Sequence, residues 1–417
     1  MRSILSAFDV ARRGHGFLLA ILLVCPVAAG CMTPAPPPPP PPKAVSAPTL
    51  SQTAPTHPLT GERPGFLRLG NMNSGRIPVR VGVLLPFTSG SSSTRGLAAS
   101  MMKAAQLALF DAHNSDLLLM SADEGSTPAQ AESGARTLLA QGAEIIVGPL
   151  FASSVAAVAP IARDHGVPVI SFSTDRSVAG NGVYLLSFQP ENEVHRIVTY
   201  AASQGHAVFA AIVPNTAYGA RVAAAFSNDV KAAGAHIADV EKFEPGSSGI
   251  STAAKSVANT KPDAILIAQG GSLLREIGPT LATEGAGNQT VQYLGTGLWD
   301  DPANEQEPGL AGGWFTAPAS SGHQTFEAHY RGQFGSSPSQ LSTLAYDAVS
   351  LVALLSSGQP YHRFTDASLT DPNGFAGVDG IFRFEPDGSS QRGLAILRVE
   401  PAGFQIVSPA PKTFEGS

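Results

Sequence analysis

Cysteine is almost absent from this chain of 417 residues. Its two cysteines, Cys25 and Cys31, lie within the first 31 residues, so the rest of the chain has none. This excludes a disulfide scaffold, and it excludes cysteine nucleophiles and thiolate metal sites beyond residue 31. Charged residues are also few, at 14%, and the 26 Lys and Arg are outnumbered by 32 Asp and Glu. Nucleic acid is therefore excluded as the main partner, because its phosphates are bound by basic surfaces.

A hydrophobic run long enough to span a membrane is missing as well. The most apolar stretch, Phe17 to Ala29, has 13 residues, whereas a membrane-spanning helix needs about 20. Such a run, preceded by Arg2, Arg12 and Arg13 and followed by small residues, is typical of a secretory signal peptide. We therefore assign residues 1–30 to a signal peptide and expect export to the periplasm.

The end of this segment, Val27-Ala28-Ala29-Gly30-Cys31, resembles a bacterial lipobox. The resemblance implies that Cys31 is lipidated and becomes the mature N-terminus. The alternative is ordinary cleavage after a small residue, with Cys31 as an incidental thiol. In the lipoprotein-sorting pattern that this resembles, Asp in the next position retains a protein at the inner membrane. Met32 therefore indicates an anchor in the outer membrane, and lipid is the only membrane contact that we expect.

A proline run follows the cysteine. Pro34 and then Pro36 to Pro42 lead into a stretch rich in Ala, Ser, Thr and Pro that ends near Pro64. Proline runs form an extended, stiff helix of about 3.1 Å per residue. We interpret residues 31–75 as a lipid anchor and tether that hold a folded body, residues 76–404, away from a membrane surface. Residues 405–417 are interpreted as a tail.

The body alternates short apolar runs with helical periodicity. Nearly continuous apolar runs are typical of strands in a parallel sheet that helices cover on both faces. The runs are Val79–Pro86, Leu117–Ala122, Glu144–Pro149, Val167–Phe172, Val208–Pro214, His236–Phe243, Ala264–Ala268 and Val291–Leu294. Between them, sets such as Leu97, Met101, Ala104, Ala105 and Ala108 share one helical face. The pattern predicts an α/β fold of two doubly wound lobes with mostly parallel sheets.

The C-terminal part changes character. Ile381–Phe384, the turn Pro386-Asp387-Gly388 and Leu394–Val399 predict a strand, a tight turn and a second strand. We expect this hairpin to complete one sheet near the hinge.

Seven segments in this order and spacing resemble the leucine-binding type of type I periplasmic binding proteins. They are Val81–Pro86, Ile145–Pro149, Val167–Ser171, Asn215–Gly219, Pro262–Leu266, Ala345–Val349 and Gly377–Gly380. The resemblance implies two lobes that are joined by a three-strand hinge and close on a small polar ligand such as an amino acid. By the same resemblance, lobe one is about 79–188 and 319–390, and lobe two is about 189–318 and 391–404.

Two further segments, Gly295–Asp301 and Gly312–Pro318, resemble the binding-protein-like domain of penicillin-binding-protein activators. Those outer-membrane lipoproteins stimulate peptidoglycan synthases across the periplasm. In this comparison Trp299 and Trp314 are interface candidates, with core packing as the alternative for each. The N-terminal helical-repeat domain of some members has no counterpart between Met32 and Ser74.

Signatures of catalysis are lacking. Ser100-Met101-Met102-Lys103 matches the S-x-x-K pattern, but its companion elements are missing and it falls in an amphipathic helix. We find no G-x-S-x-G, P-loop or H-E-x-x-H segment. The acidic loop from Asp300 to Glu307 does not have the spacing of an EF-hand. We therefore expect no catalytic residues, no metal and no cofactor.

Candidate ligand-binding residues follow the predicted strands. Thr88 follows the first strand, Ser153 opens a helix after the third, and Ser173 and Thr174 follow the fourth. Hydroxyls and free N–H groups at a helix start form a natural carboxylate site, although Ser153 can equally be a simple N-cap. The family resemblance implies that these loops hold an amino acid and that Tyr218 closes over it from lobe two. It also implies an acidic partner for the ligand's ammonium group, for which Asp300 is the candidate.

Three functions remain open. The first is a non-enzymatic, lipid-anchored regulator of a periplasmic peptidoglycan synthase. The alternative is the substrate-binding protein of an ABC importer for branched-chain or similar amino acids, whose partner is an ABC permease. A third is a sensor that binds a small ligand and signals to another protein.

Overall fold

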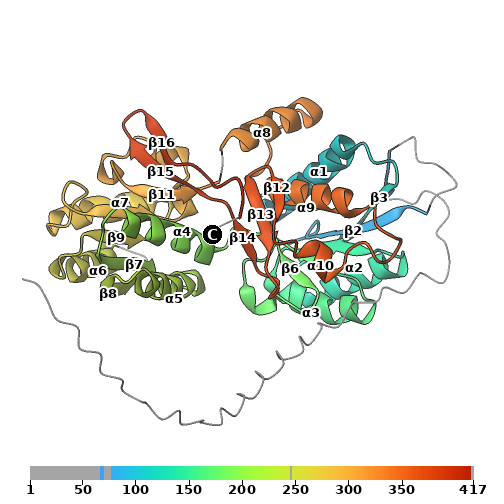
Figure 1. The fold of residues 1–417 in the computed structure, drawn as a ribbon, viewed down its shortest axis with the longest axis horizontal. Helices are drawn as coiled ribbons and strands as arrows, with labels where there is room; N and C mark the ends of the chain where they lie inside the picture. Colours follow the sequence, from blue (N-terminus) through green and yellow to red (C-terminus); the bar gives the residue numbers. More distant parts are fainter. Residues whose placement is uncertain (1–65, 70–76, 245–246, 319, 415–417) are drawn as a thin grey trace, which may run out of the picture. The chain divides into compact units, whose positions relative to one another are not determined.

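The computed structural model describes residues 66–69, 77–244, 247–318 and 320–414. They form a six-stranded sheet, a seven-stranded sheet and a small three-stranded sheet with flanking helices (Figure 1). The signal segment, Cys31 and the proline run lie outside the described residues. Within the described part, no helix is long and apolar enough to cross a membrane.

The six-stranded sheet, with order β1-β3-β2-β4-β5-β6, is the centre of lobe one. Its strands are β1 (Phe66–Leu67), β2 (Val79–Leu85), β3 (Leu117–Asp123), β4 (Ile145–Val147), β5 (Val169–Ser171) and β6 (Val183–Leu185). All neighbouring pairs are parallel except β1 with β3. Because β1 comes from the segment that we assigned to the tether, Phe66–Leu67 of that segment belongs to the sheet.

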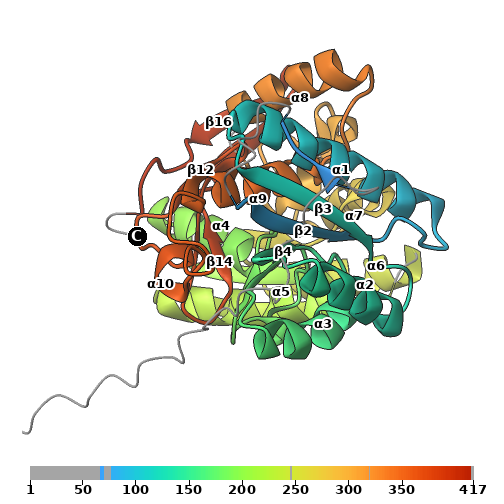
Figure 2. The same cartoon turned by 90° about the vertical axis from the view of Figure 1, so that its right-hand side faces the viewer.

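Helices cover both faces of this sheet. They are α1 (Ser92–Ala112), α2 (Pro128–Ala140), α3 (Ala152–Asp164), α8 (Ser320–Phe334), α9 (Ser342–Leu355) and the short α10 (Asp366–Leu369). Along β2, Val81 and Val83 face α1, α8 and α9, whereas Leu84 faces α2 and α3. Figure 2 shows α1 and α9 on one side of β2 and β3, with α2 and α3 on the other. Burial on both faces explains why β2 is apolar at every position except Arg80 and Gly82.

The seven-stranded sheet, with order β16-β15-β11-β10-β9-β7-β8, is the centre of lobe two. Its strands are β7 (Val208–Pro214), β8 (His236–Phe243), β9 (Ala264–Ile267), β10 (Gln292–Gly295), β11 (Trp314–Ala317), β15 (Ala395–Glu400) and β16 (Gly403–Ser408). Its helices are α4 (Pro190–Ser203), α5 (Ala217–Ala232), α6 (Ser247–Asn259) and α7 (Gly271–Thr283). β15 is antiparallel to both β11 and β16, and the other pairs are parallel. The predicted α/β fold with mostly parallel sheets is confirmed.

The third sheet corrects the predicted C-terminal hairpin. It consists of β12 (Phe375–Gly377), β13 (Gly380–Phe384) and β14 (Ser390–Arg392). The predicted turn is present, but β13 pairs with β14, and Leu394–Val399 largely becomes β15 in lobe two. The return arm is short because the chain leaves for the other lobe directly after Arg392. Phe375, Phe382 and Phe384 of this sheet join the lobe one core.

The lobes contact each other where the chain passes between them. Residues 186–189 lead from β6 into α4, and residues 393–394 lead from β14 into β15. Arg392 Nε donates a hydrogen bond to the carbonyl of Ser187 at 3.3 Å, and Asn192 Nδ2 donates to the carbonyl of Ser390 at 2.6 Å. These bonds join β14 to the first of these connections and to the start of α4, and a further crossing leads from β11 of lobe two to α8 of lobe one.

Candidate functional site

Four of the predicted ligand residues lie at one edge of the lobe one sheet. β2, β4 and β5 are parallel neighbours, so their carboxyl ends open onto the same edge. Thr88 follows β2, Ser153 lies in the first turn of α3 after β4, and Ser173 and Thr174 follow β5. In open α/β sheets this edge is the usual location of a ligand site.

Two of these hydroxyls are committed to the protein itself. The Thr88 side chain donates to Asp123 Oδ2, and its backbone N–H donates to Asp123 Oδ1 at 3.1 Å. Burial raises the pKa of Asp123, but the hydrogen bonds from Thr88 and Gly125 outweigh this effect and lower it. Ser173 is buried, and its Oγ accepts the N–H of Asp175 at 3.1 Å. Thr88 and Ser173 therefore hold the shapes of their loops.

Ser153 and Thr174 are exposed. Neither side chain has a hydrogen-bond partner among the described residues, so both hydroxyls are available to a ligand. The structure places Phe151, rather than Ser153, at the N-cap of α3, and Phe151 makes no side-chain capping bond. The N-cap interpretation of Ser153 is therefore wrong.

The start of α3 is capped by Glu124, which the sequence analysis overlooked. This side chain is fully buried, and its carboxylate accepts the N–H groups of Leu150 at 2.8 Å and Phe151 at 3.0 Å. Burial raises the pKa of Glu124, and these bonds together with one to Ser154 oppose that rise. Its carboxylate satisfies the two N–H groups just before the helix, whereas the first-turn N–H groups of residues 152–154 have no partner within the helix.

The lobe two half of the candidate site gathers around Tyr218. This residue lies in the first turn of α5 after β7, and its hydroxyl is 2.9 Å from Thr296 Oγ1 at the end of β10. Glu193, in the first turn of α4, accepts the N–H of Gly297 at 3.1 Å. Burial raises the pKa of Tyr218, and the charge of Glu193 raises it further. The phenol therefore stays protonated and acts as a hydrogen-bonding group.

Among the carboxylates of the lobe two half, Glu193 has the pKa that is shifted furthest from its ordinary value. Burial raises its pKa to about 7, and the neighbouring charge of Glu191 adds to the rise. The nearby Arg221 is already paired with Glu191, at 2.8 and 2.6 Å. Glu193 has no ion-pair partner among the described residues. A carboxylate of this kind is suited to a cationic group brought by a ligand.

The charged residues that act on Asp300 are not those around Tyr218. It follows the short 3-10 helix η2 (Gly297–Trp299), and its charged neighbours are His323, Asp379, Glu305 and Asp301. Burial raises its pKa, and the positive charge of His323 lowers it. The structure thus brings Asp300 together with His323 and Asp379 of lobe one rather than with Tyr218.

A family model described as a periplasmic binding protein matches residues 78–404. The chain belongs to the periplasmic binding protein family. Its fold is the two-lobe type I fold of that family. The match runs from the residue before β2 to the second residue of β16, so it takes in both sheets apart from β1 and most of β16.

Solved structures resemble this periplasmic binding protein over most of its length. A putative branched-chain amino acid ABC transporter protein from Rhodospirillum rubrum has a TM-score of 0.70 at 20% identity and covers 79% of this chain and 100% of its own. LivJ from Streptococcus pneumoniae, in complex with isoleucine, has a TM-score of 0.56 at 20% identity, covering 80% and 100%. A Rhodopseudomonas palustris (R. palustris) solute-binding protein in complex with benzoate has a TM-score of 0.56 at 17% identity, covering 80% and 97%. A comparison with curated proteins returns no match.

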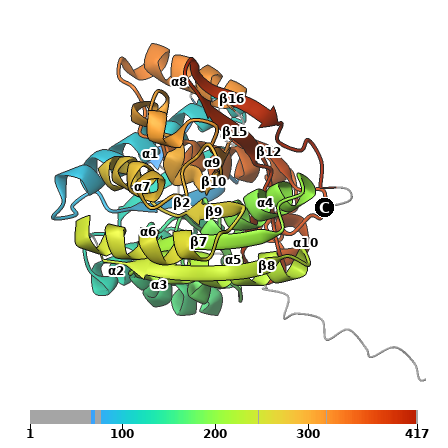
Figure 3. The same ribbon diagram turned by 90° about the vertical axis from the view of Figure 1, so that its left-hand side faces the viewer.

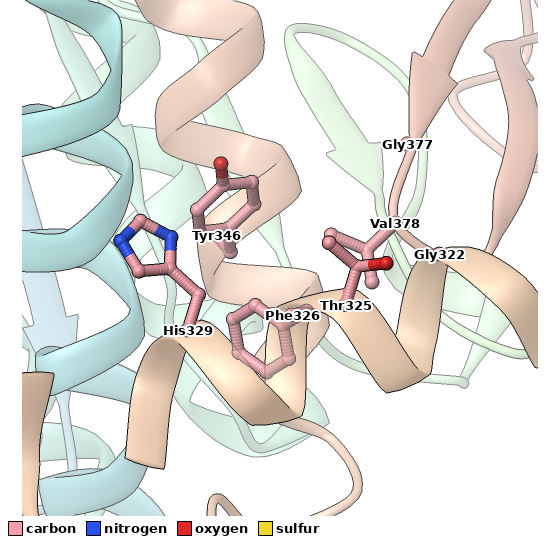
Figure 4. Close-up of a pocket in the computed structure, with 7 residues that line it drawn as sticks. All are labelled: Gly322, Thr325, Phe326, His329, Tyr346, Gly377 and Val378. Atoms are coloured by element: carbon pink, nitrogen blue, oxygen red, sulfur yellow. The ribbon is translucent and has the colours of Figure 1, made fainter. Parts of the chain in front are cut away.

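A pocket of about 340 Å³ lies elsewhere on lobe one of this periplasmic binding protein (Figure 4). It is lined by α8, α9 and the turn after β12, with Phe326, His329 and Tyr346 among its side chains. None of the six predicted ligand residues lines this pocket. His329 and Tyr346 both contact Asp111 of α1, so their polar atoms already have a partner within the protein.

The side chains of the S-x-x-K segment of the periplasmic binding protein take part in packing between helices. Ser100 is buried and its Oγ is 2.7 Å from Ser342 Oγ and 3.1 Å from the Tyr330 hydroxyl. Lys103 Nζ lies 5.6 Å from the centre of the Phe334 ring. The serine therefore joins α1 to α8 and α9, while the lysine contacts an aromatic ring.

The two tryptophans of the periplasmic binding protein pack inside lobe two. Trp299 is fully buried, and its Nε1 donates to the Ile267 carbonyl at 3.0 Å. Trp314 is half-buried and packs edge-on against Tyr200, with ring centres 5.0 Å apart. Core packing therefore accounts for Trp299, and it is not an interface residue.

Glu124 and Glu193 are the residues that sequence reasoning missed. Glu124 directly follows β3, in the same kind of position as Thr88 after β2. A search for acidic groups after strands, in addition to hydroxyls, would have found it. Glu193 lies inside a helix, where an acidic first turn also has an ordinary explanation in the helix dipole.

Proposed function

We propose that this chain is a solute-binding protein of an ABC importer, and that its ligand carries both a carboxylate and an ammonium group. One observation carries the proposal. At the carboxyl edges of the two sheets, lobe one presents unpartnered hydroxyls beside a helix start, and lobe two presents an unpaired carboxylate beside a tyrosine. These two halves have the opposite charge preferences that a small zwitterion needs.

On the lobe one side, the first-turn N–H groups of α3 and the hydroxyls of Ser153 and Thr174 are suited to a carboxylate. Helix starts favour anions through their free N–H groups and the helix dipole. Thr88 and Ser173 hold the loops in place. On the lobe two side, Tyr218 and Glu193 are suited to the ammonium group, so Glu193 replaces Asp300 in that role.

The relatives support a ligand of this size and class. LivJ is solved with isoleucine, an amino acid, and the R. palustris protein with benzoate, a carboxylate without an amine. The unpaired Glu193 favours the first kind over the second, because benzoate would leave that carboxylate without a cation. We also propose that the protein is non-enzymatic and acts in the periplasm, in keeping with its family.

Calorimetric titration of the full-length protein with isoleucine, 3-methylpentanoate and benzoate tests the proposal. We expect isoleucine to bind, and its deaminated analogue 3-methylpentanoate to bind at least tenfold more weakly. Ser153→Ala and Tyr218→Phe should each weaken isoleucine binding, since each removes one hydrogen-bonding group. Ser133→Ala, an exposed change on α2, is the matched control. Absence of binding by all three compounds at millimolar concentration would overturn the proposal.

A second candidate is a lipid-anchored regulator of a peptidoglycan synthase. Its support is the lipobox-like segment ending at Cys31, followed by Met32 and the proline run. An outer-membrane anchor would separate the protein from a permease in the inner membrane. Fractionation of cells that produce the protein and its Cys31→Ala variant tests this candidate. Recovery in the outer membrane that depends on Cys31 would favour the regulator, and recovery in the inner membrane or the soluble periplasm would oppose it.

A further inference from the structure

The chain continues past the last strand of lobe two and returns to lobe one. β16 ends at Ser408 and, among the described strands, pairs with β15 alone. Ala410 still packs against the lobe two core, whereas Phe414 is buried with 6% of its surface exposed. In Figure 3 the red chain leaves the end of β16 and runs toward the point marked C. We call residues 409–414 the strap.

Phe414 packs against Arg383 and Gly374 of lobe one, and we call this contact site the seat. The Arg383 guanidinium of β13 lies 4.6 Å from the centre of the Phe414 ring, in the range of a cation–π contact. Arg383 is itself held by Glu385, at 2.9 Å, and by the Pro372 carbonyl, at 3.1 Å. The position is therefore fixed before Phe414 packs against it.

Gly374 forms the other wall of the seat. A Cβ at this position would lie 2.7 Å from Cε2 of Phe414, closer than any side chain tolerates. Its φ of +71° is also in the left-handed region, which glycine adopts without strain. The Cβ would also lie 2.6 Å from the Phe382 carbonyl oxygen, so both the neighbouring strand and the Phe414 ring require glycine here.

The strap runs beside the connection between β14 and β15. A Cβ on Gly393, within that connection, would lie 3.1 Å from the Pro411 carbonyl. The match to the family model ends at residue 404, so the whole strap lies beyond the part of the chain that the family model describes.

We propose that the strap is an extra connection between the lobes, which limits how far lobe two moves away from lobe one. Six residues reach at most about 20 Å when fully extended. With Phe414 seated on lobe one and β16 fixed in lobe two, the strap therefore sets an upper bound on their separation. Release of Phe414 removes this bound without breaking the other connections.

Distances between spin labels on the two lobes test the strap. The labels are attached at Ser133→Cys on α2 and Lys231→Cys on α5, both exposed, in full-length protein with Cys25→Ser and Cys31→Ser. These replacements leave no other cysteine in the chain. We expect Phe414→Ala to lengthen and broaden the distance distribution in the absence of any ligand.

Phe404→Ala is the matched control. Phe404 lies in β16, and the centre of its ring is 4.8 Å from the centre of the Phe315 ring. Its replacement therefore weakens packing in lobe two without changing the seat on lobe one. It should leave the distance distribution unchanged. A chain that ends at Ser408 removes the whole strap and provides a second test if Phe414→Ala misfolds, as judged by circular dichroism. Distributions that match the parent in both strap variants would overturn the proposal, and this result is independent of ligand binding.

Discussion

The carboxylate of Glu193 accepts a hydrogen bond from the backbone N–H of Gly297 at 3.1 Å. This bond ties the first turn of α4 to the turn after β10. A Cβ on Gly297 would lie only 2.9 Å from Glu193 Oε1, so the glycine lets the two segments approach. The acidic group thereby reaches the same strand edge as Tyr218, although it comes from the helix through which the chain enters lobe two.

Glu193→Gln should make the protein more stable at pH 8 and change little at pH 4. Burial raises the pKa of Glu193 to about 7 in the folded state, well above its ordinary value of 4.5. The folded protein therefore binds a proton more tightly than the unfolded chain, and the stability that this contributes is lost as the pH rises through about 7. Glutamine keeps the acceptor for Gly297 without the charge. We expect a gain of about 1–3 kcal/mol at pH 8 from urea unfolding.

Glu191→Gln provides the comparison for this measurement. Glu191 is paired with Arg221, so its replacement should destabilise the protein at pH 8. If Glu193→Gln changes the free energy of unfolding equally at pH 4 and pH 8, the carboxylate is not the group that titrates.

Much of the fold follows from the sequence because burial leaves a simple pattern. Each of the eight apolar runs overlaps a strand, since helices cover both faces of both sheets. On α1, Met101, Ala104, Ala105 and Ala108 are all buried, as their spacing predicts, whereas Leu97 of the same predicted face is half-buried. The prediction of the C-terminal hairpin was wrong about the second strand. Local turn signals identify a turn, but they do not decide which later segment pairs with the strand before it.

The candidate site was less predictable because its chemistry depends on neighbours that are distant in the sequence. Thr88 is committed to Asp123, 35 positions away, and no local pattern reveals this. Asp300 does follow a strand, yet the pKa of its side chain responds to the charges of His323 and Asp379 from lobe one. The sequence locates loops at the sheet edge, whereas the direction of each side chain is decided by tertiary packing.

His323→Asn should remove a pH-dependent part of the stability. His323 Nδ1 lies 2.9 Å from Asp379 Oδ1, and that carboxylate is 1% exposed. This hydrogen bond raises the pKa of His323 despite burial, and the charges of Asp379, Glu327 and Asp300 raise it further. The stabilisation is complete below the ordinary value of 6.5 and is lost as the pH rises through the raised value. Asparagine keeps a donor for Asp379 but carries no charge.

The free energy of unfolding, measured by urea at pH 5.5 and pH 9, checks this prediction. The parent should exceed His323→Asn by about 1 kcal/mol at pH 5.5, with a smaller difference at pH 9. His195→Asn is the control, because His195 pairs with Asp229 at the same 2.9 Å but is 64% exposed. Solvent weakens such a pair, so its effect should be smaller. A pH dependence that His323→Asn leaves intact would contradict the assignment.

Gly295→Ala should destabilise lobe two through a single methyl group. A Cβ on Gly295 would lie 2.3 Å from Cδ2 of Trp299, whose ring is fully buried and anchored to Ile267 by its Nε1. Because neither the ring nor the strand can move freely, we expect a loss of about 1–3 kcal/mol in urea unfolding. Gly332→Ala on α8 is the matched control, since its Cβ would meet nothing within 4 Å. That change should be neutral or stabilising, because alanine favours helix.

Trp299→Phe tests whether the indole is the group that the new methyl group meets. Phenylalanine lacks one ring of the indole, so the double variant Gly295→Ala, Trp299→Phe should lose less free energy of unfolding than the sum of the two single variants. Additive losses would mean that the alanine methyl group and the indole ring do not compete for the same space.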